Sequence, residues 1–308
     1  KAAAGAAGLI KTALALHHKV LPKTLKVDAP DPDLKVAESP FSLSTETRPW
    51  IAADGHPRRA GVSAFGFGGS NFHLVLEEYS PRKTAVAWDG SVEIVAFSAP
   101  DAQALRKRLQ EAAAALKPTT PPAEIARLAD ASRRSFSPRD AHRLVLTIQR
   151  PPAATSAQWA AAFSGSLAQA AEMLAKNGCD RSWGLAGVFY GCGPPAAKTA
   201  FLFPGQGSQY VGMGRDLACV FPEALAAFEA ADGAWDASPK LSETVFPCPA
   251  RSEQEKAARE ESLRRTDKAQ PAIGALSLAM LAVLERFGVR PQATCGHSYG
   301  ELTALHAA

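Results

Sequence analysis

A serine held between two glycines, with a strand-like run before it and a helix-like run after it, constrains the fold of this chain more than any other feature. The motif is G-H-S-Y-G at residues 296–300, the strand-like run covers residues 293–295, and residues 301–308 open a helix. In that context a G-x-S-x-G turn strains the serine backbone and lifts its hydroxyl out of a sheet. An ordinary loop serine is the alternative, but the context favours a nucleophile elbow at Ser298.

An activated serine also needs a general base within hydrogen-bond reach. His306 is the only histidine after Ser298, and its position along the helix places it about 12 Å further down the axis, too far to take the proton. His297 is adjacent in sequence, so we expect its side chain to diverge from that of Ser298. In folds of this type the base follows the nucleophile in chain order, so we expect it beyond Ala308.

Two backbone or side-chain groups are candidate donors to an oxyanion. The N–H of Tyr299 stands at the helix start, where such a donor is expected. Gln206 lies in a glycine-flanked loop that follows a strand-like run at residues 199–203. For Gln206 the sequence leaves two readings open, an oxyanion donor or an exposed loop amide.

Three motifs in order resemble the malonyl-type acyltransferases of fatty-acid and polyketide synthases: F-P-G-Q-G-S-Q at residues 203–209, Q-P-A at residues 270–272, and G-H-S-Y-G-E at residues 296–301. The resemblance implies that Ser298 becomes acyl-esterified and that Gln206 and the Tyr299 amide bind the oxyanion. It also implies that His297 and Gln270 belong to the substrate-binding residues. The family's base and its carboxylate-binding arginine have no matching position in this chain.

The front of the chain resembles the end of a β-ketoacyl synthase of the thiolase fold. The resemblance rests on K-A-A-A-G at residues 1–5 and on F-G-F-G-G-S-N-F-H-L-V-L-E-E at residues 65–78. The catalytic cysteine and histidines of that family lie upstream of this segment. Phe67 matches the residue that gates the family's acyl pocket, while the alternative reading is a structural turn between two strands. The loop runs into a strand and lacks a third glycine, so a dinucleotide site is not indicated.

Strands alternating with helices between these two segments predict a small α+β unit, which resembles the linker domain between ketosynthase and acyltransferase. We therefore predict three segments, at residues 1–79, 80–198 and 199–308. The amino-acid sequences at residues 296–305 and 19–22 most resemble those of polyunsaturated-fatty-acid or enediyne-type iterative synthases. The helices of the middle unit are expected at about 101–116, 122–135 and 156–176, and its strands at about 92–97, 142–149 and 185–190.

The amino-acid composition limits the kinds of partner and the cellular location that the sequence indicates. The net charge is +4 over 34 basic and 30 acidic residues without long like-charge blocks, so neither nucleic acid nor a membrane is indicated. Five cysteines without C-x-x-C spacing argue against a disulfide framework or a zinc site and favour a cytoplasmic location. The chain lacks an initiating Met and a signal peptide, so we expect an internal slice of a longer protein.

The expected fold class is α/β: a thiolase-fold remnant, a small α+β linker and a partial α/β-hydrolase-like acyltransferase core. The resemblances imply transfer of a malonyl-type group from malonyl-CoA to an acyl carrier protein domain through a Ser298 ester. They also imply contacts with other synthase domains and a parent that dimerises through its ketosynthase. No cofactor is expected in this chain, although the parent would use phosphopantetheinyl carrier domains. A serine acyl hydrolase and a non-catalytic linker fragment are the alternatives.

Overall fold

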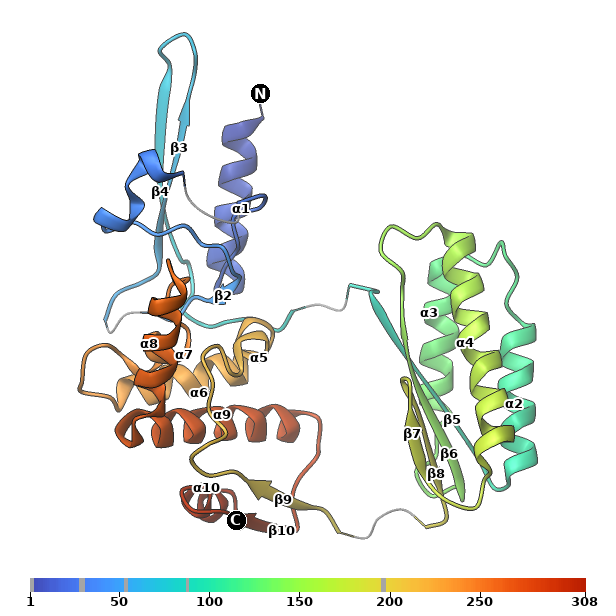
Figure 1. Ribbon diagram of the computed structural model, residues 1–308. Helices are drawn as coiled ribbons and strands as arrows, with labels where there is room; N and C mark the ends of the chain where they lie inside the picture. Colours follow the sequence, from blue (N-terminus) through green and yellow to red (C-terminus); the bar gives the residue numbers. More distant parts are fainter. Residues whose placement is uncertain (1–2, 28–30, 53–54, 87–88, 195–197) are drawn as a thin grey trace. The chain divides into compact units, whose positions relative to one another are not determined.

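The computed structural model describes residues 3–27, 31–52, 55–86, 89–194 and 198–308. Its contacts divide the chain into two compact units, residues 1–86 together with 198–308 (unit 1) and residues 87–197 (unit 2) (Figure 1). The start of the K-A-A-A-G run and residues 195–197, just before the predicted third segment, lie outside the described residues. Unit 1 thus combines residues from the first and third predicted segments.

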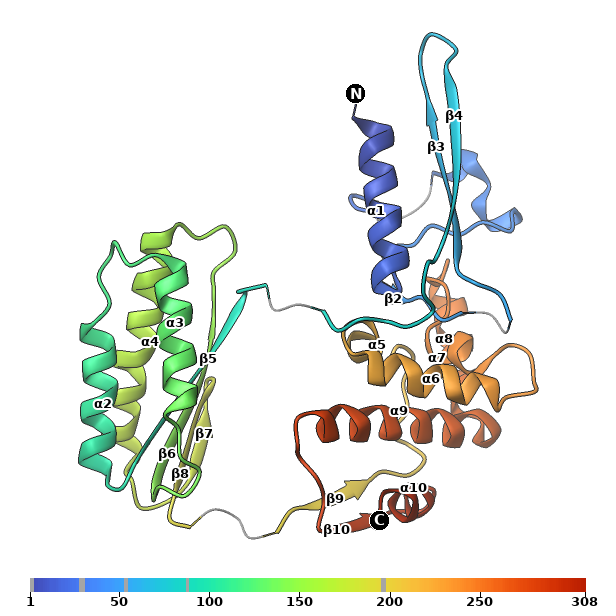
Figure 2. The same ribbon diagram turned by 180° about the vertical axis from the view of Figure 1, so that it is seen from behind.

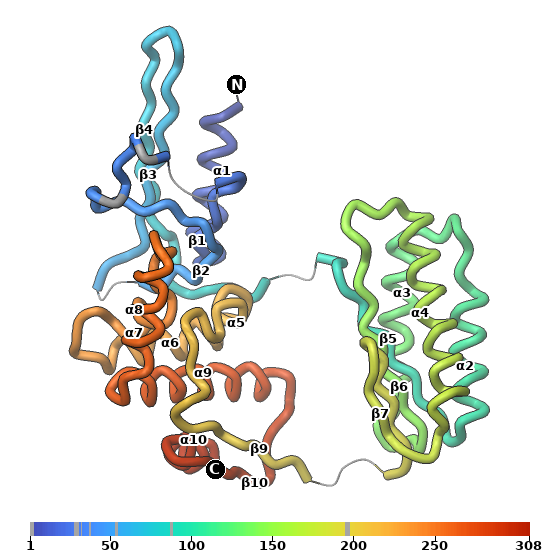
Figure 3. The backbone as a smooth tube through the Cα atoms, in the orientation of Figure 1, coloured from blue at the N-terminus to red at the C-terminus, as the bar shows by residue number. Residues whose placement is uncertain are grey.

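Unit 2 is a four-stranded antiparallel sheet with its helices on one face (Figure 3). Along β6 the side chains of Leu144, Leu146 and Ile148 are buried and those of Thr147 and Gln149 are exposed, because one face packs on the helices. The strand order is β5-β6-β8-β7. The elements are β5 (Val92–Ala99), α2 (Ala102–Ala114), α3 (Pro122–Arg134), β6 (His142–Gln149), α4 (Ser156–Asn177), β7 (Trp183–Leu185) and β8 (Val188–Cys192).

Side-chain hydrogen bonds begin helix α4 and cover the outer edge of strand β5 in unit 2. Thr155 and Gln158 form a capping box that begins α4. The exposed edge of β5 is covered by α3, because Ser132 Oγ accepts from the Ala96 N–H at 3.1 Å and Arg133 donates to the Ile94 carbonyl at 2.6 Å. Such covering prevents pairing of the edge with another strand. The three helices and the strands predicted at about 92–97 and 142–149 are confirmed to within two residues. The single strand predicted at about 185–190 is wrong, because Ala186 and Gly187 have positive φ and form a turn between the antiparallel strands β7 and β8.

The front part of unit 1 is a long hairpin packed beside a helix. Its elements are α1 (Ala4–His18), β1 (Val20–Leu21), β2 (Arg48–Pro49), β3 (Arg59–Phe65) and β4 (Asn71–Glu77), with 3-10 turns at Pro32–Leu34 and Val36–Glu38. Gly5 and Gly8 let α1 approach β3 closely, since a Cβ on Gly5 would lie 3.1 Å from the Ala64 Cβ. The two strands and the tight loop predicted around residues 65–71 are confirmed.

The rear part of unit 1 consists of a parallel strand pair and helices. Its elements are β9 (Ala200–Phe203), α5 (Arg215–Val220), α6 (Pro222–Gly233), α7 (Leu241–Val245), α8 (Glu253–Arg264), α9 (Thr266–Arg286), β10 (Ala293–Gly296) and α10 (Gly300–Ala307). Helix α6 packs along α9 around the buried Phe228 and Ala272. The sequence did not predict α5 and α7, which have six and five residues and therefore little periodicity. Among the described residues, no helix is long and apolar enough to span a bilayer.

Candidate active site

The glutamine loop and the serine elbow meet because β9 and β10 are parallel neighbours. Phe203 pairs with Gly296 at the carboxyl end of the pair, and the His297 N–H donates to the Phe203 carbonyl at 3.0 Å. The carboxyl ends of parallel strands meet at one edge of a sheet, where the following loops gather. Residues 204–209 and 297–299 therefore lie at the same edge, although almost ninety positions separate them in the chain.

The turn at Ser298 has the geometry of a nucleophile elbow. Ser298 has a φ of 55°, in the left-handed region that a non-glycine residue rarely adopts, and it is exposed. The flanking glycines are required sterically, because a Cβ on Gly296 would lie 2.2 Å from the Gly300 carbonyl carbon and one on Gly300 would lie 2.2 Å from the Phe203 oxygen. The strand–turn–helix expected from the sequence is thus confirmed, while the chemical role of Ser298 stays a prediction.

The glutamine loop touches the elbow through Gly205. A Cβ on Gly205 would lie 2.9 Å from the Ser298 Cβ and 2.5 Å from the His297 carbonyl oxygen, so only glycine allows this approach. Within the described residues, the backbone N–H groups of Gln206 and Tyr299 donate to no protein acceptor. Both N–H groups are therefore available to a ligand beside Ser298.

The side chain of Gln206 is engaged away from the serine. Its amide nitrogen donates to the Arg264 carbonyl and to Thr266 Oγ1, each at 3.2 Å. The two side-chain N–H bonds are thereby used at the junction of α8 and α9. Of the two ways in which Gln206 can serve an oxyanion, the geometry favours its backbone N–H.

Gln270 and Tyr299 join the same neighbourhood through α9. Gln270 Nε2 lies 3.5 Å from Gln206 Oε1. One helical turn later, a Cβ on Gly274 would lie 2.7 Å from the Tyr299 hydroxyl oxygen, so the tyrosine ring packs directly on that glycine. Tyr299 and His306 also line a cavity of ≈ 800 Å³ between α6, α9 and α10. Neither Gly205 nor Gly274 was predicted as a site residue, although Gly205 stands inside the F-P-G-Q-G-S-Q motif.

Two other predicted site residues lie differently. Phe67 is fully exposed in the loop that joins β3 to β4, and the tip of this hairpin lies at the opposite end of unit 1 from α10 (Figures 1 and 2). Its predicted role concerns the acyl pocket of a ketosynthase and not the surroundings of Ser298, and it stays a prediction. His297 is exposed, and its Nδ1 would lie 3.2 Å from a Cβ on Gly205. The imidazole thus sits over the glutamine loop, at the edge where Ser298 is presented.

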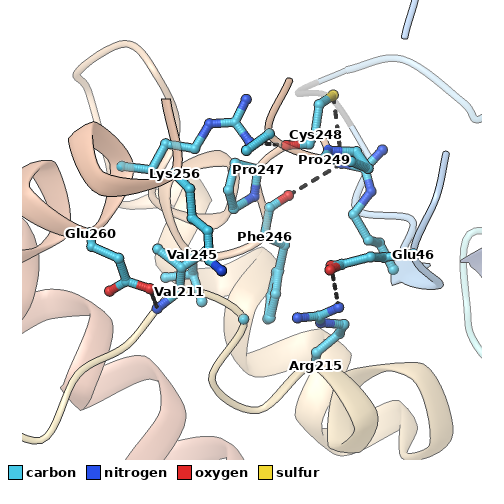
Figure 4. Close-up of a pocket in the computed structure, with 14 residues that line it drawn as sticks. Glu46, Val211, Arg215, Val245, Phe246, Pro247, Cys248, Pro249, Lys256 and Glu260 are labelled. Atoms are coloured by element: carbon cyan, nitrogen blue, oxygen red, sulfur yellow. Dashed lines mark hydrogen bonds and ion pairs between the residues drawn. The ribbon is translucent and has the colours of Figure 1, made fainter. Parts of the chain in front are cut away.

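A second, smaller cavity of ≈ 180 Å³ in unit 1 is bounded by basic side chains and a cysteine (Figure 4). Glu46 faces Arg215 across it in an ion pair. Arg48 Nη1 donates to the Phe246 carbonyl at 3.3 Å and lies 3.6 Å from Cys248 Sγ. Burial opposes ionisation of this thiol, but hydrogen bonding from Ser42 and the nearby arginines lower the pKa of Cys248 overall.

Comparison with known proteins shows the family to which the chain belongs. Residues 200–308 match the acyl transferase domain family, residues 30–143 the ketoacyl-synthetase C-terminal extension and residues 1–28 the C-terminal domain of β-ketoacyl synthases. Over essentially the whole chain, identity is 34% to polyketide synthase GfsA of Streptomyces halstedii and 35% to the phenolphthiocerol synthesis polyketide synthase type I Pks15/1 of Mycobacterium bovis. The chain belongs to the type I polyketide synthases. This polyketide synthase segment spans only 4% and 14% of the length of those two relatives.

Solved structures agree with the fold of this polyketide synthase segment. The acyltransferase domain from module 8 of the salinomycin polyketide synthase is 25% identical, with a TM-score of 0.51 over 71% of this chain and 45% of that one. The acyl transferase domain of ZmaA is 23% identical, with a TM-score of 0.52 over 72% of this chain and 44% of that one. The expected α/β fold class is thereby confirmed.

Proposed function

We propose that the complete protein transfers a malonyl-type acyl group from CoA to an acyl carrier protein domain through an ester on Ser298. The observation that carries the proposal is the left-handed φ of 55° at Ser298, which presents the hydroxyl at the edge where Gln206 also lies. A serine in such an elbow is the usual nucleophile of acyl transfer in α/β folds. The domain match to residues 200–308 supports the reaction class.

The chemistry would proceed in two balanced halves. Ser298 Oγ attacks the thioester carbonyl of the acyl-CoA while a base takes its proton, and the carbonyl oxygen becomes an oxyanion that accepts from the N–H groups of Gln206 and Tyr299. The C–S bond then breaks and CoA leaves as its thiol, with the proton returned from the base. In the second half the base takes the proton of the carrier thiol, the sulfur attacks the ester carbonyl, the C–O bond to Ser298 Oγ breaks, and the base returns the proton to that oxygen.

The acyl acceptor separates the transferase from a serine hydrolase, which uses the same elbow but passes the acyl group to water. The carrier, the other synthase domains and dimerisation through the ketosynthase follow from the family alone. The segment bounds 1–79, 80–198 and 199–308 rest on changes in the sequence pattern. The placement among polyunsaturated-fatty-acid or enediyne-type iterative synthases rests on residues 296–305 and 19–22.

Covalent loading of the complete parent protein tests the proposal. After incubation with malonyl-CoA, intact-protein mass spectrometry should detect one malonyl adduct at the acyltransferase domain, and Ser298→Ala should remove it. Ser262→Ala is the control, since the Ser262 hydroxyl accepts from the Lys268 ammonium at 2.7 Å and is no part of the elbow, so loading should persist. An adduct that survives Ser298→Ala would overturn the elbow assignment. Release of malonate faster than its transfer to added carrier would favour the hydrolase.

A further inference from the structure

Arg58 is a buried arginine at the start of the hairpin, and each end of its guanidinium has a partner. Nε donates to the Trp50 carbonyl at 2.5 Å and Nη1 to Glu78 at 2.8 Å. Nη2 forms an ion pair with Glu229, which lies on α6 in the acyltransferase segment. The Arg58 side chain is 1% exposed, so its guanidinium is shielded from water, whereas the Glu229 side chain is 33% exposed.

The charges around Arg58 are unbalanced without α6. Lys19, Arg58 and Lys83 are buried cations from residues 1–86. Within the described part of that segment, Glu78 is the carboxylate partner of Lys19, at 2.6 Å, and of Arg58, whose backbone N–H donates to it at 3.0 Å, whereas Lys83 donates to the His18 carbonyl. A buried charge is costly unless it is paired and hydrogen-bonded. Glu229 supplies the second carboxylate, so the segment 1–86 needs α6 beside it.

Helix α6 carries the contact toward the candidate active site. On another face, Ala227, Ala230 and Ala231 line the cavity that Tyr299 and His306 close from the other side. The helix thus contacts Arg58 through Glu229 and forms one wall of the space beside the elbow. A shift of the ketosynthase-derived segment, residues 1–86, would therefore be transmitted through the rigid helix α6 to that wall of the cavity.

We propose that Arg58 is a positioning residue that couples the ketosynthase-derived segment to helix α6, and through α6 fixes the wall of the cavity beside Tyr299. The coupling goes beyond the acyl transfer proposed above and does not depend on acylation of Ser298. Because the ion pair joins two segments, it must act in both directions. Loosening either partner should loosen the other segment as well.

Hydrogen exchange on the 308-residue chain tests this reciprocity. Arg58→Gln should raise the exchange rates of amides in α6 (222–233) by about tenfold or more. Arg59→Gln is the matched control, because the neighbouring Arg59 forms an exposed pair with Glu77 and should change α6 by less than about twofold. The amides of α4 in unit 2 serve as the internal reference.

The reverse direction uses Glu229, the partly exposed partner, which keeps the test decisive even if Arg58→Gln fails to fold. Glu229→Ala should raise exchange at residues 76–80, whereas Glu223→Ala, on the same helix but paired with Arg286, should not. The double variant Arg58→Gln/Glu229→Ala should match the Arg58 single variant, and Arg58→Lys should lie between wild type and Arg58→Gln. Additive effects, or effects confined to the mutated segment, would overturn the coupling.

Discussion

The hydroxyl of Tyr299 occupies the space that a side chain at position 274 would need: a Cβ on Gly274 would lie 2.7 Å from the Tyr299 oxygen and 3.0 Å from a ring carbon. Tyr299, the residue after Ser298, therefore packs on a position of α9 that has no side chain. The position of Tyr299 therefore depends on which residue stands at position 274. This matters because the Tyr299 N–H is a candidate oxyanion donor.

The first prediction concerns that contact. Gly274→Ala should push the Tyr299 ring and its backbone N–H away from their positions, and a displacement of about 1 Å near reacting atoms costs roughly a hundredfold in rate. The rate of malonyl loading in the parent, followed by quenched-flow mass spectrometry, measures the effect. Gly165→Ala is the control, because its added Cβ would meet nothing within 4 Å and alanine should stabilise α4 by about 0.5–1 kcal/mol. Unchanged loading in Gly274→Ala would show that the packing does not position Tyr299.

The second prediction separates the two roles of Gln206. Gln206→Ala removes the side-chain bonds to Arg264 and Thr266 but keeps the backbone N–H. Loading should therefore slow by less than about tenfold, well short of the roughly hundred- to thousandfold loss that follows removal of an oxyanion donor. Thr266→Val, which deletes one acceptor of the same amide, should have a similarly small effect. A loss of a thousandfold in Gln206→Ala would assign the oxyanion contact to the side chain.

The third prediction is the pH dependence of thiol alkylation. The thiolate is the reactive form, so a thiol with a lowered pKa reacts at lower pH than free cysteine, whose pKa is about 8.5. For Cys248 the pKa is lowered, whereas burial raises the pKa of Cys219 to about 11. Peptide mass spectrometry after iodoacetamide treatment should place the midpoint for Cys248 below that of a free cysteine and leave Cys219 unmodified. Arg48→Gln should move the Cys248 midpoint upward. Equal midpoints for the two cysteines would contradict this assignment.

The fourth prediction concerns unit 2. Phe163 is fully buried in its core and packs edge-on against Trp159, with ring centroids 5.5 Å apart. In residues 87–197 produced alone, Phe163→Ala should lower the free energy of unfolding by about 3–5 kcal/mol. Phe189→Ala, at an exposed position of β8, should change it by less than about 0.5 kcal/mol. Urea unfolding followed by circular dichroism gives both values. Failure of the wild-type segment to unfold cooperatively would contradict an independent core.

Limited proteolysis of the whole chain tests the independent stability of unit 2 without excising it. The sequence predicts a resistant core near residues 85–195, and in the structure residues 87–197 form one compact unit. Early cleavage inside that span, with the flanking segments surviving, would count against an independently stable linker.

Sequence alone determined the elements whose signals are local. The strand predicted at about 142–149 matches β6, and the helix predicted at about 122–135 matches α3 to within one residue. The glycines around Ser298 predicted the elbow, because a tight turn depends on the few residues that form it. These features depend on neighbours along the chain, which is why a sequence can specify them.

Tertiary structure decided which groups meet. Nothing in the sequence distinguishes Arg58 from Arg59, yet one is buried against Glu229 and the other forms an exposed pair with Glu77. Likewise, the sequence left two readings for Gln206, and its side chain turned out to bond Thr266, sixty positions away. Such contacts follow from the packing of α6, α8 and α9 against distant segments, and packing depends on the whole fold. The burial that makes an ion pair matter is therefore a property of the three-dimensional structure and not of any motif.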